Sequence, residues 1–154
     1  MDASSEVSVR EVLARTELFQ PVGEQDLARL AKRAAFRYFA PGDVICYEGE
    51  AADTLYVIAS GSVAIRLNGQ TDRPISVLDS GDFFGEIALI IGARRTATVT
   101  AETELALLEL PGEEILSLAA RCLPFRVRLG KIGTTRSRGS LATRLSSSRT
   151  NPRS

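Results

Sequence analysis

The amino-acid sequence predicts a mainly β domain of the sandwich, jelly-roll or barrel type, with helices before and after it. Two observations lead to this prediction. Within residues 34–110, short runs of alternating apolar and polar residues are separated by turns, a pattern typical of antiparallel sheets with one buried face. On both sides of this region, apolar residues recur at the three- to four-residue spacing of a helix.

Two short helices are expected in residues 7–33. Ser8 and Glu11 have the spacing of a capping box, which predicts that the first helix begins at Ser8. Beyond Pro21 and Gly23, one face of a second helix collects four apolar residues: Leu27, Leu30, Ala31 and Ala34. Two short helices therefore precede residue 35.

The strands are expected in runs that end at glycine, proline or aspartate turns. Such runs cover residues 36–40, 44–50, 54–60, 62–69, 73–79, 95–101 and 104–111. In the fourth run, Val63, Ile65 and Leu67 share one face, because successive strand residues point to opposite sides. Close spacing of short strands favours antiparallel pairing.

The chain returns to a helical pattern in residues 111–129. Pro124 must end or kink this helix, because proline lacks the backbone N–H that a helix interior needs. Residues 125–133 fit either a second short helix or an extended segment. Residues 130–154 are rich in Ser, Thr, Arg and Gly, a composition that predicts a basic, disordered tail.

Composition narrows the classes of function. No apolar run is long enough to span a bilayer and the N-terminus lacks a secretory pattern, so a cytoplasmic location is expected. The chain of 154 residues has no histidine, which removes the commonest general base and metal ligand. Cys46 and Cys122 are interpreted as core residues rather than ligands. The expectation is therefore a protein that is not an enzyme and has no metal site.

Charge is distributed unevenly along the chain. All 19 acidic residues and 10 of the 19 basic residues lie in residues 1–114, whereas residues 115–154 carry only basic charges. An acidic body with a basic tail is therefore predicted. The tail could bind nucleic acid, anionic lipid or an acidic partner, be phosphorylated, or remain solvated; solvated disorder is the preferred interpretation.

The stretch FFGEIALIIGARRTATV, residues 83–99, has the features of an anion site. A short helix beginning at Gly85 or Glu86 leaves backbone N–H groups that favour phosphate or carboxylate. Strand parity places Arg95 on the side of Ala97, Val99 and Ala101, which should face the core. A buried guanidinium needs an anionic partner. Either Arg95 pairs with Glu86 or another carboxylate, or the stretch binds an external anion.

This stretch resembles the phosphate-binding cassette of cyclic nucleotide-binding domains, in which F-G-E-[LI]-A-L is followed by R-[TAS]-A-[TS]-V. PGDVICYEGE, ADTLYVIASGSV and VLDSGDFFGE match the family in the same order, so the resemblance covers residues 12–125. It implies an eight-stranded antiparallel β roll, jelly-roll-like, with N-terminal helices, a cassette helix and a C-terminal helix.

The resemblance also implies roles for individual residues. Arg95 would pair with the cyclic phosphate and Glu86 would accept a hydrogen bond from the ribose 2′-OH. The cassette would be lined by Gly85, Ile87, Ala88 and Leu89, with backbone N–H groups near Ala88 and Leu89 meeting phosphate or sugar. Thr96 would contact the phosphate or a guanine edge, or be an ordinary strand residue. The purine would be met by Val63, Ile65 and Val77, although plain core residues are the preferred interpretation of these three. A lid residue would come from residues 125–129.

One position departs from the family pattern. Arg94 stands where many members have proline, and it should face solvent rather than the phosphate.

The expected function is a sensor that binds cAMP or cGMP without a cofactor and moves its flanking helices. The chain shows no helix-turn-helix after the roll and no kinase motif. It is therefore expected to be free-standing or the regulatory part of a larger protein such as an ion channel, with an effector protein or pore domain as partner and homo-oligomerisation left open. The alternative is a degenerate β-roll interaction module that binds no nucleotide.

Overall fold

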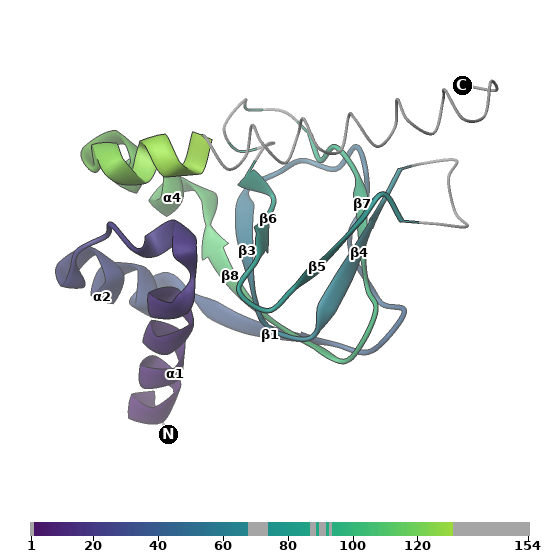
Figure 1. Ribbon diagram of the computed structural model, residues 1–154, viewed down its shortest axis with the longest axis horizontal. Helices are drawn as coiled ribbons and strands as arrows, with labels where there is room; N and C mark the ends of the chain where they lie inside the picture. The colour runs from purple at the N-terminus through teal and green to yellow at the C-terminus, as the bar shows by residue number, and fades with distance from the viewer. Residues whose placement is uncertain (1, 68–73, 87–88, 90–91, 93, 131–154) are drawn as a thin grey trace.

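The computed structural model describes residues 2–67, 74–86, 89, 92 and 94–130. Ile87, Ala88 and the tail after residue 130 lie outside the described residues, as do the expectations attached to them. Figure 1 shows helices gathered beside a curved set of strands.

The N-terminal helices are α1 (Asp2–Arg15), a short 3-10 turn η1 (Glu17–Phe19) and α2 (Glu24–Arg33). The prediction that the first helix begins at Ser8 is wrong. Residues 2–7 contain no proline or glycine, so nothing stops the helix from extending upstream of the capping box. The apolar face of α2 is confirmed, because Leu30 and Ala31 are buried.

Eight strands form two four-stranded antiparallel sheets, which confirms the predicted β roll. The strands are β1 (Ala35–Phe39), β2 (Val44–Cys46), β3 (Thr54–Ser60), β4 (Ser62–Arg66), β5 (Ser76–Asp79), β6 (Phe83–Phe84), β7 (Thr98–Ala101) and β8 (Leu105–Pro111). Their orders are β1-β8-β3-β6 and β2-β7-β4-β5.

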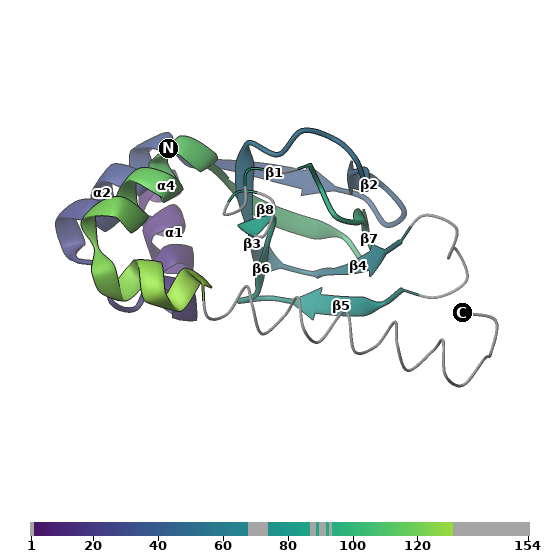
Figure 2. The same ribbon diagram turned by 90° about the horizontal axis from the view of Figure 1, so that it is seen from above.

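The first sheet separates two apolar cores. Leu55, Val57 and Leu108 face a core shared with the helices, while Ile58 and Leu107 face the interior of the roll. Strand alternation produces this division, because neighbouring residues point to opposite sides of the sheet. Figure 2 shows α1, α2 and α4 together at one end of the roll.

The C-terminal region is two helices rather than one. Helix α4 (Gly112–Arg121) is followed by a break at Cys122 and by helical residues 123–130. Pro124 lies in the first turn of the second helix, where its missing N–H costs no hydrogen bond. Phe125 is fully buried and its ring stacks on that of Phe19 with centroids 5.5 Å apart.

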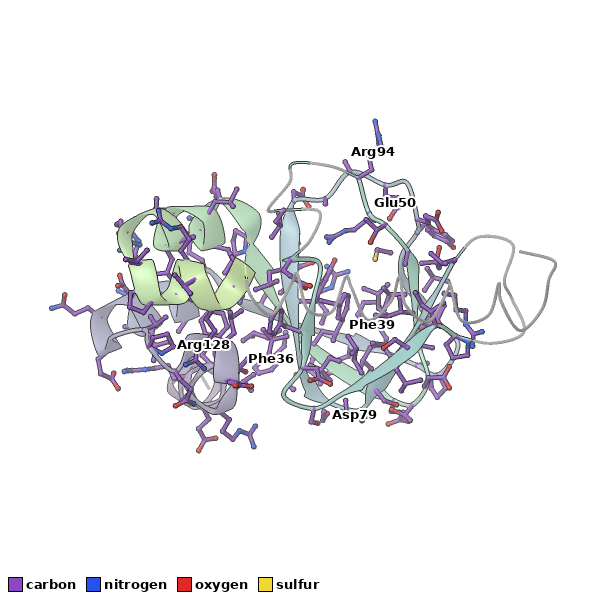
Figure 3. The ribbon with its side chains drawn as sticks, turned by 45° about the horizontal axis from the view of Figure 1, so that its top comes forward. Phe36, Phe39, Glu50, Asp79, Arg94 and Arg128 are labelled. Carbon is purple, nitrogen blue, oxygen red and sulfur yellow. The ribbon has the colours of Figure 1, made fainter. Side chains whose placement is uncertain are left out.

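This packing bears on the expected lid. Phe125 and Leu129 belong to the core beside the helices and not to the interior of the roll. Arg128, in the same segment, donates a hydrogen bond to the Glu17 carbonyl oxygen at 3.0 Å. Figure 3 shows Arg128 beside the N-terminal helices, so residues 125–129 lie against these helices.

Ion pairs join α2 to α4 at both ends. Arg33 pairs with Glu114 at 2.6 Å and with Glu113 at 3.1 Å, where α2 ends and α4 begins. At the other end, Arg121 pairs with Asp26 at 2.9 Å. The two helices are therefore antiparallel neighbours.

Candidate functional site

Arg95 is a buried arginine at the entrance to β7. Only 7% of its surface is exposed, and Ala97, Val99 and Ala101 on the same parity are buried too. Thr96 between them is exposed. The predicted orientation of Arg95 towards the core side is therefore confirmed.

The backbone of Arg95 is held by the loop that follows β2. Its N–H donates to the Glu50 carbonyl oxygen at 2.7 Å, and its own carbonyl oxygen accepts from the Gly49 N–H at 2.9 Å. Arg94 bridges to Ala51 and projects outward above this loop, near Glu50 in Figure 3. The paired backbone sets the starting direction of the Arg95 side chain.

The guanidinium of Arg95 is held by backbone oxygens and an aromatic ring. Nη2 donates to the Thr54 carbonyl oxygen at 3.0 Å and Nη1 to that of Gly85 at 3.4 Å. The Cζ atom lies 5.6 Å from the centroid of the Tyr56 ring. Among the described residues, the ion pairs do not include Arg95. Within the described residues, these two carbonyl oxygens accept from two of the five N–H donors of the guanidinium.

Gly85 is required by this arrangement for two reasons. Its φ of +98° lies in the region that glycine adopts without strain. A Cβ atom at this position would lie 2.6 Å from Arg95 Nη1 and 2.9 Å from the Thr54 carbonyl oxygen. The side chain of Arg95 therefore occupies the space that any other residue at position 85 would need.

Replacing Gly85 by alanine should destabilise the fold and displace Arg95. The positive φ alone costs alanine about 1–2 kcal/mol, and the overlap with Nη1 adds to this. Gly81→Ala is the matched control, because Gly81 has a φ of +92° but no atom within 4 Å of the added Cβ. Urea unfolding of both variants measures the difference; equal losses would show that the contact with Arg95 carries no cost.

Glu86 and Leu89 are both helical residues of the cassette, and both are buried. Glu86 is 2% exposed. Leu89 belongs to the core beside the helices, and its N–H donates to the Gly85 carbonyl oxygen at 3.4 Å. The helical turn therefore engages that donor in this structure, and a contact between the Leu89 N–H and the ligand stays a prediction.

The residues expected at the purine do not lie together. Val63 is fully buried in the interior of the roll. Val77 pairs with Ala64 and is 49% exposed, whereas its neighbour Leu78 is buried in the interior. Val77 thus points away from the interior that contains Val63, and the two side chains do not form one surface.

Cys46 and Tyr56 are further side chains beside Arg95, and neither was among the expected ligand contacts. Burial raises the pKa of the Cys46 thiol, and the Arg95 charge opposes this rise. Burial and then the Glu109 carboxylate raise the pKa of Tyr56 to about 12, again opposed by Arg95. Both groups are therefore protonated at neutral pH.

The sequence model of the "Cyclic nucleotide-binding domain" matches residues 36–122. The match spans more than half of the chain and contains Gly85, Glu86 and Arg95. The chain belongs to the cyclic nucleotide-binding domain family. This confirms the resemblance seen in residues 83–99.

Relatives of this cyclic nucleotide-binding domain occur within larger proteins. A cyclic nucleotide-gated potassium channel of Rhizobium etli is 39% identical over 100 residues, 65% of this chain and 27% of the channel. A cGMP-dependent protein kinase of Caenorhabditis elegans is 36% identical over 109 residues, 69% of this chain and 13% of the kinase. The chain therefore spans about a quarter or less of the length of these curated relatives.

Solved structures share the fold of this cyclic nucleotide-binding domain. The regulatory domain of Toxoplasma gondii PKA with cAMP superposes with a TM-score of 0.73 at 21% identity, over 88% of this chain and 51% of that one. The sensor domain of the transcriptional regulator DNR from Pseudomonas aeruginosa gives 0.75 at 22% identity, over 85% and 89%.

The described part of the chain lacks two features. It contains no group of three or more His, Cys, Asp or Glu residues arranged to hold a metal ion. None of its helices combines the length and the apolar character needed to cross a membrane.

Proposed function

We propose that this chain is a non-catalytic sensor that binds cAMP or cGMP with the phosphate at Arg95. The observation that carries the proposal is the state of the guanidinium, which is buried and held by carbonyl oxygens. An uncompensated buried charge is costly, and a phosphate can form paired, charge-assisted hydrogen bonds with such a group.

The neighbouring cassette residues fit the same ligand. Gly85 lets the Arg95 guanidinium lie against the cassette backbone, because it has no side chain to displace Nη1. We assign the ribose 2′-OH contact to Glu86, whose carboxylate can accept a hydrogen bond. Glu86 follows Gly85 directly, so the sugar and phosphate contacts come from one short segment.

We further propose that the ligand shifts the flanking helices through Leu89. A Cβ added to Gly112 would lie 2.7 Å from Leu89 Cδ2, so the cassette touches the first residue of α4. A ligand that draws Gly85 and Glu86 towards itself would move Leu89 and hence α4. The ligand can shift this equilibrium only by its different affinity for the two arrangements.

The output is proposed to lie outside this chain. Its relatives include a potassium channel and a protein kinase, of which it spans 27% and 13%. A regulatory role within a larger protein, or in contact with a separate effector, fits this coverage. The rival proposal is an interaction module that has lost nucleotide binding, and retention of the buried Arg95 argues against it.

Isothermal calorimetry with cAMP, cGMP and 5′-AMP tests the proposal. We expect at least one cyclic nucleotide to bind at micromolar concentration and 5′-AMP, whose phosphate is not cyclic, to bind more weakly. Absence of binding of both cyclic nucleotides below millimolar concentration would contradict the sensor and favour the interaction module.

Thr96 should affect the choice of base. It is exposed next to Arg95, and we propose that its hydroxyl contacts a bound guanine. Loss of one hydrogen bond costs about 0.5–1.5 kcal/mol, so we expect Thr96→Ala to weaken cGMP binding about two- to tenfold while changing cAMP binding little. Competition calorimetry measures both affinities. Equal losses would assign the hydroxyl to the phosphate, and no loss would make Thr96 an ordinary strand residue.

A further inference from the structure

Tyr56 lies under the anion site and is fixed on more than one side. Its ring stacks on Phe84, with centroids 5.0 Å apart and planes inclined by 22°. The two residues are directly paired across β3 and β6. Arg95 Cζ lies 5.6 Å from the centroid of the same ring, which is within the range of a cation–π contact.

Glu109 lies beside Tyr56 on the neighbouring strand. The two residues are register partners across β3 and β8, and the charge of the Glu109 carboxylate adds to burial in raising the pKa of Tyr56. Glu109 is itself paired with Arg37 at 3.3 Å. Arg37, Glu109 and Tyr56 therefore form a chain across three neighbouring strands.

This chain lies on the inner face of the sheet. Arg37 pairs with Leu107 in the register of β1 and β8, and Leu107 faces the interior of the roll. Figure 3 shows that Phe36 and Phe39 of the same strand point to opposite sides, Phe36 towards the helices and Phe39 into the roll. The polar chain thus runs along the interior side and reaches Arg95 through the Tyr56 ring.

The contacts of Arg95 leave one of its sides to this ring. The Thr54 and Gly85 carbonyl oxygens accept hydrogen bonds from its Nη atoms. Nη1 also lies so close to Gly85 that a Cβ atom on that residue would overlap it. Carbonyl oxygens alone fix two donors but permit the guanidinium plane to turn about the side-chain torsions. The Tyr56 ring, which is held by stacking on Phe84, restricts this rotation.

We propose that Tyr56 is a positioning residue that holds the Arg95 guanidinium in the orientation that receives the cyclic phosphate. This inference rests on the proposed function for its ligand, but the orientation of Arg95 can be tested without nucleotide. Phe84 supports the ring by stacking on its face, and Glu109 lies beside it on β8. The aromatic surface is the part of Tyr56 that acts on Arg95.

The first test observes Arg95 in the ligand-free protein. A proton–nitrogen NMR spectrum of arginine side chains contains the Arg95 Nε–H signal, which is assigned by its loss in Arg95→Lys. We expect Tyr56→Leu to shift this signal and Tyr56→Phe to leave it close to its wild-type position. Tyr38→Leu is the control, because Tyr38 is 74% exposed on β1.

The second test measures affinity for cAMP and cGMP by calorimetry. A cation–π contact contributes about 0.5–2 kcal/mol, so Tyr56→Leu should weaken binding about two- to thirtyfold. Tyr56→Phe should bind with an affinity close to that of wild type, because it keeps the aromatic ring. If the hydroxyl were required, Tyr56→Phe would bind as weakly as Tyr56→Leu. If Tyr56→Leu does not fold, as judged by circular dichroism, Tyr56→Met replaces it, since an unbranched side chain fills irregular gaps.

The outcomes separate the two proposals. An unchanged Arg95 signal together with wild-type affinity in Tyr56→Leu would overturn the role of Tyr56. A shifted signal in a protein whose wild type binds neither cyclic nucleotide would support the positioning of Arg95 and refute the proposed function.

Discussion

Replacing Arg95 by leucine should weaken cyclic nucleotide binding more than any other single substitution considered. Removal of one partner from a buried, hydrogen-bonded charge pair costs about 2–5 kcal/mol, which corresponds to roughly a 30- to 5,000-fold loss of affinity. The buried position of Arg95 places the effect in this range, because little solvent is present to replace the guanidinium. Calorimetry of wild type and Arg95→Leu measures the ratio.

Arg94→Leu is the matched control for this experiment. Arg94 is the adjacent residue, is exposed and donates to the Gly49 carbonyl oxygen at 3.0 Å. It should change affinity only slightly, since exposed charges contribute little. If both variants lose affinity equally, general positive charge rather than the buried guanidinium attracts the phosphate. Wild-type affinity in Arg95→Leu would place the phosphate elsewhere.

Replacing Phe125 by alanine should cause the largest loss of stability. Phe125 is fully buried between the C-terminal helix of residues 123–130 and the N-terminal helices, where it stacks on Phe19. Truncation of a buried phenylalanine costs about 3–5 kcal/mol, because apolar surface is lost and a cavity remains. Urea unfolding followed by circular dichroism gives the free energy of unfolding.

Val127→Ala is the comparison variant, from the same helix. Val127 is 56% exposed, and substitutions at such positions usually change stability by less than about 0.5 kcal/mol. A similar loss in both variants would show that helix propensity, rather than the contact with Phe19, determines the stability of this segment.

Most of the fold could be predicted from local patterns. Seven strands are long enough for alternation to be visible, and the eighth follows from the family. Strand β6 is only two residues long, too short for any period to appear. The start of α1 was misplaced because a capping box does not exclude a helix that continues upstream.

The site was predictable in part. Parity and the cassette motif identified Arg95, and burial agrees with them. Tyr56 was missed because β3 is buried on both faces, so alternation cannot say which face meets the ligand. The Thr54 and Gly85 contacts use backbone oxygens, which every residue has, so the sequence contains no signal for them. Val77 was expected at the purine together with Val63, but its side chain points away from the interior of the roll. Its direction follows from its pairing with Ala64, which the sequence does not show.

The ion pairs between α2 and α4 restrict how these helices can move. Asp26 with Arg121 and Arg33 with Glu114 lie at opposite ends of the contact. A slide of α4 along α2 by one turn, about 5.4 Å, would separate both pairs at once. A rotation of the two helices as one body would leave both ion pairs intact. In the proposed helix movement, α2 and α4 would therefore move together, and Gly112 is the end of α4 that touches the cassette.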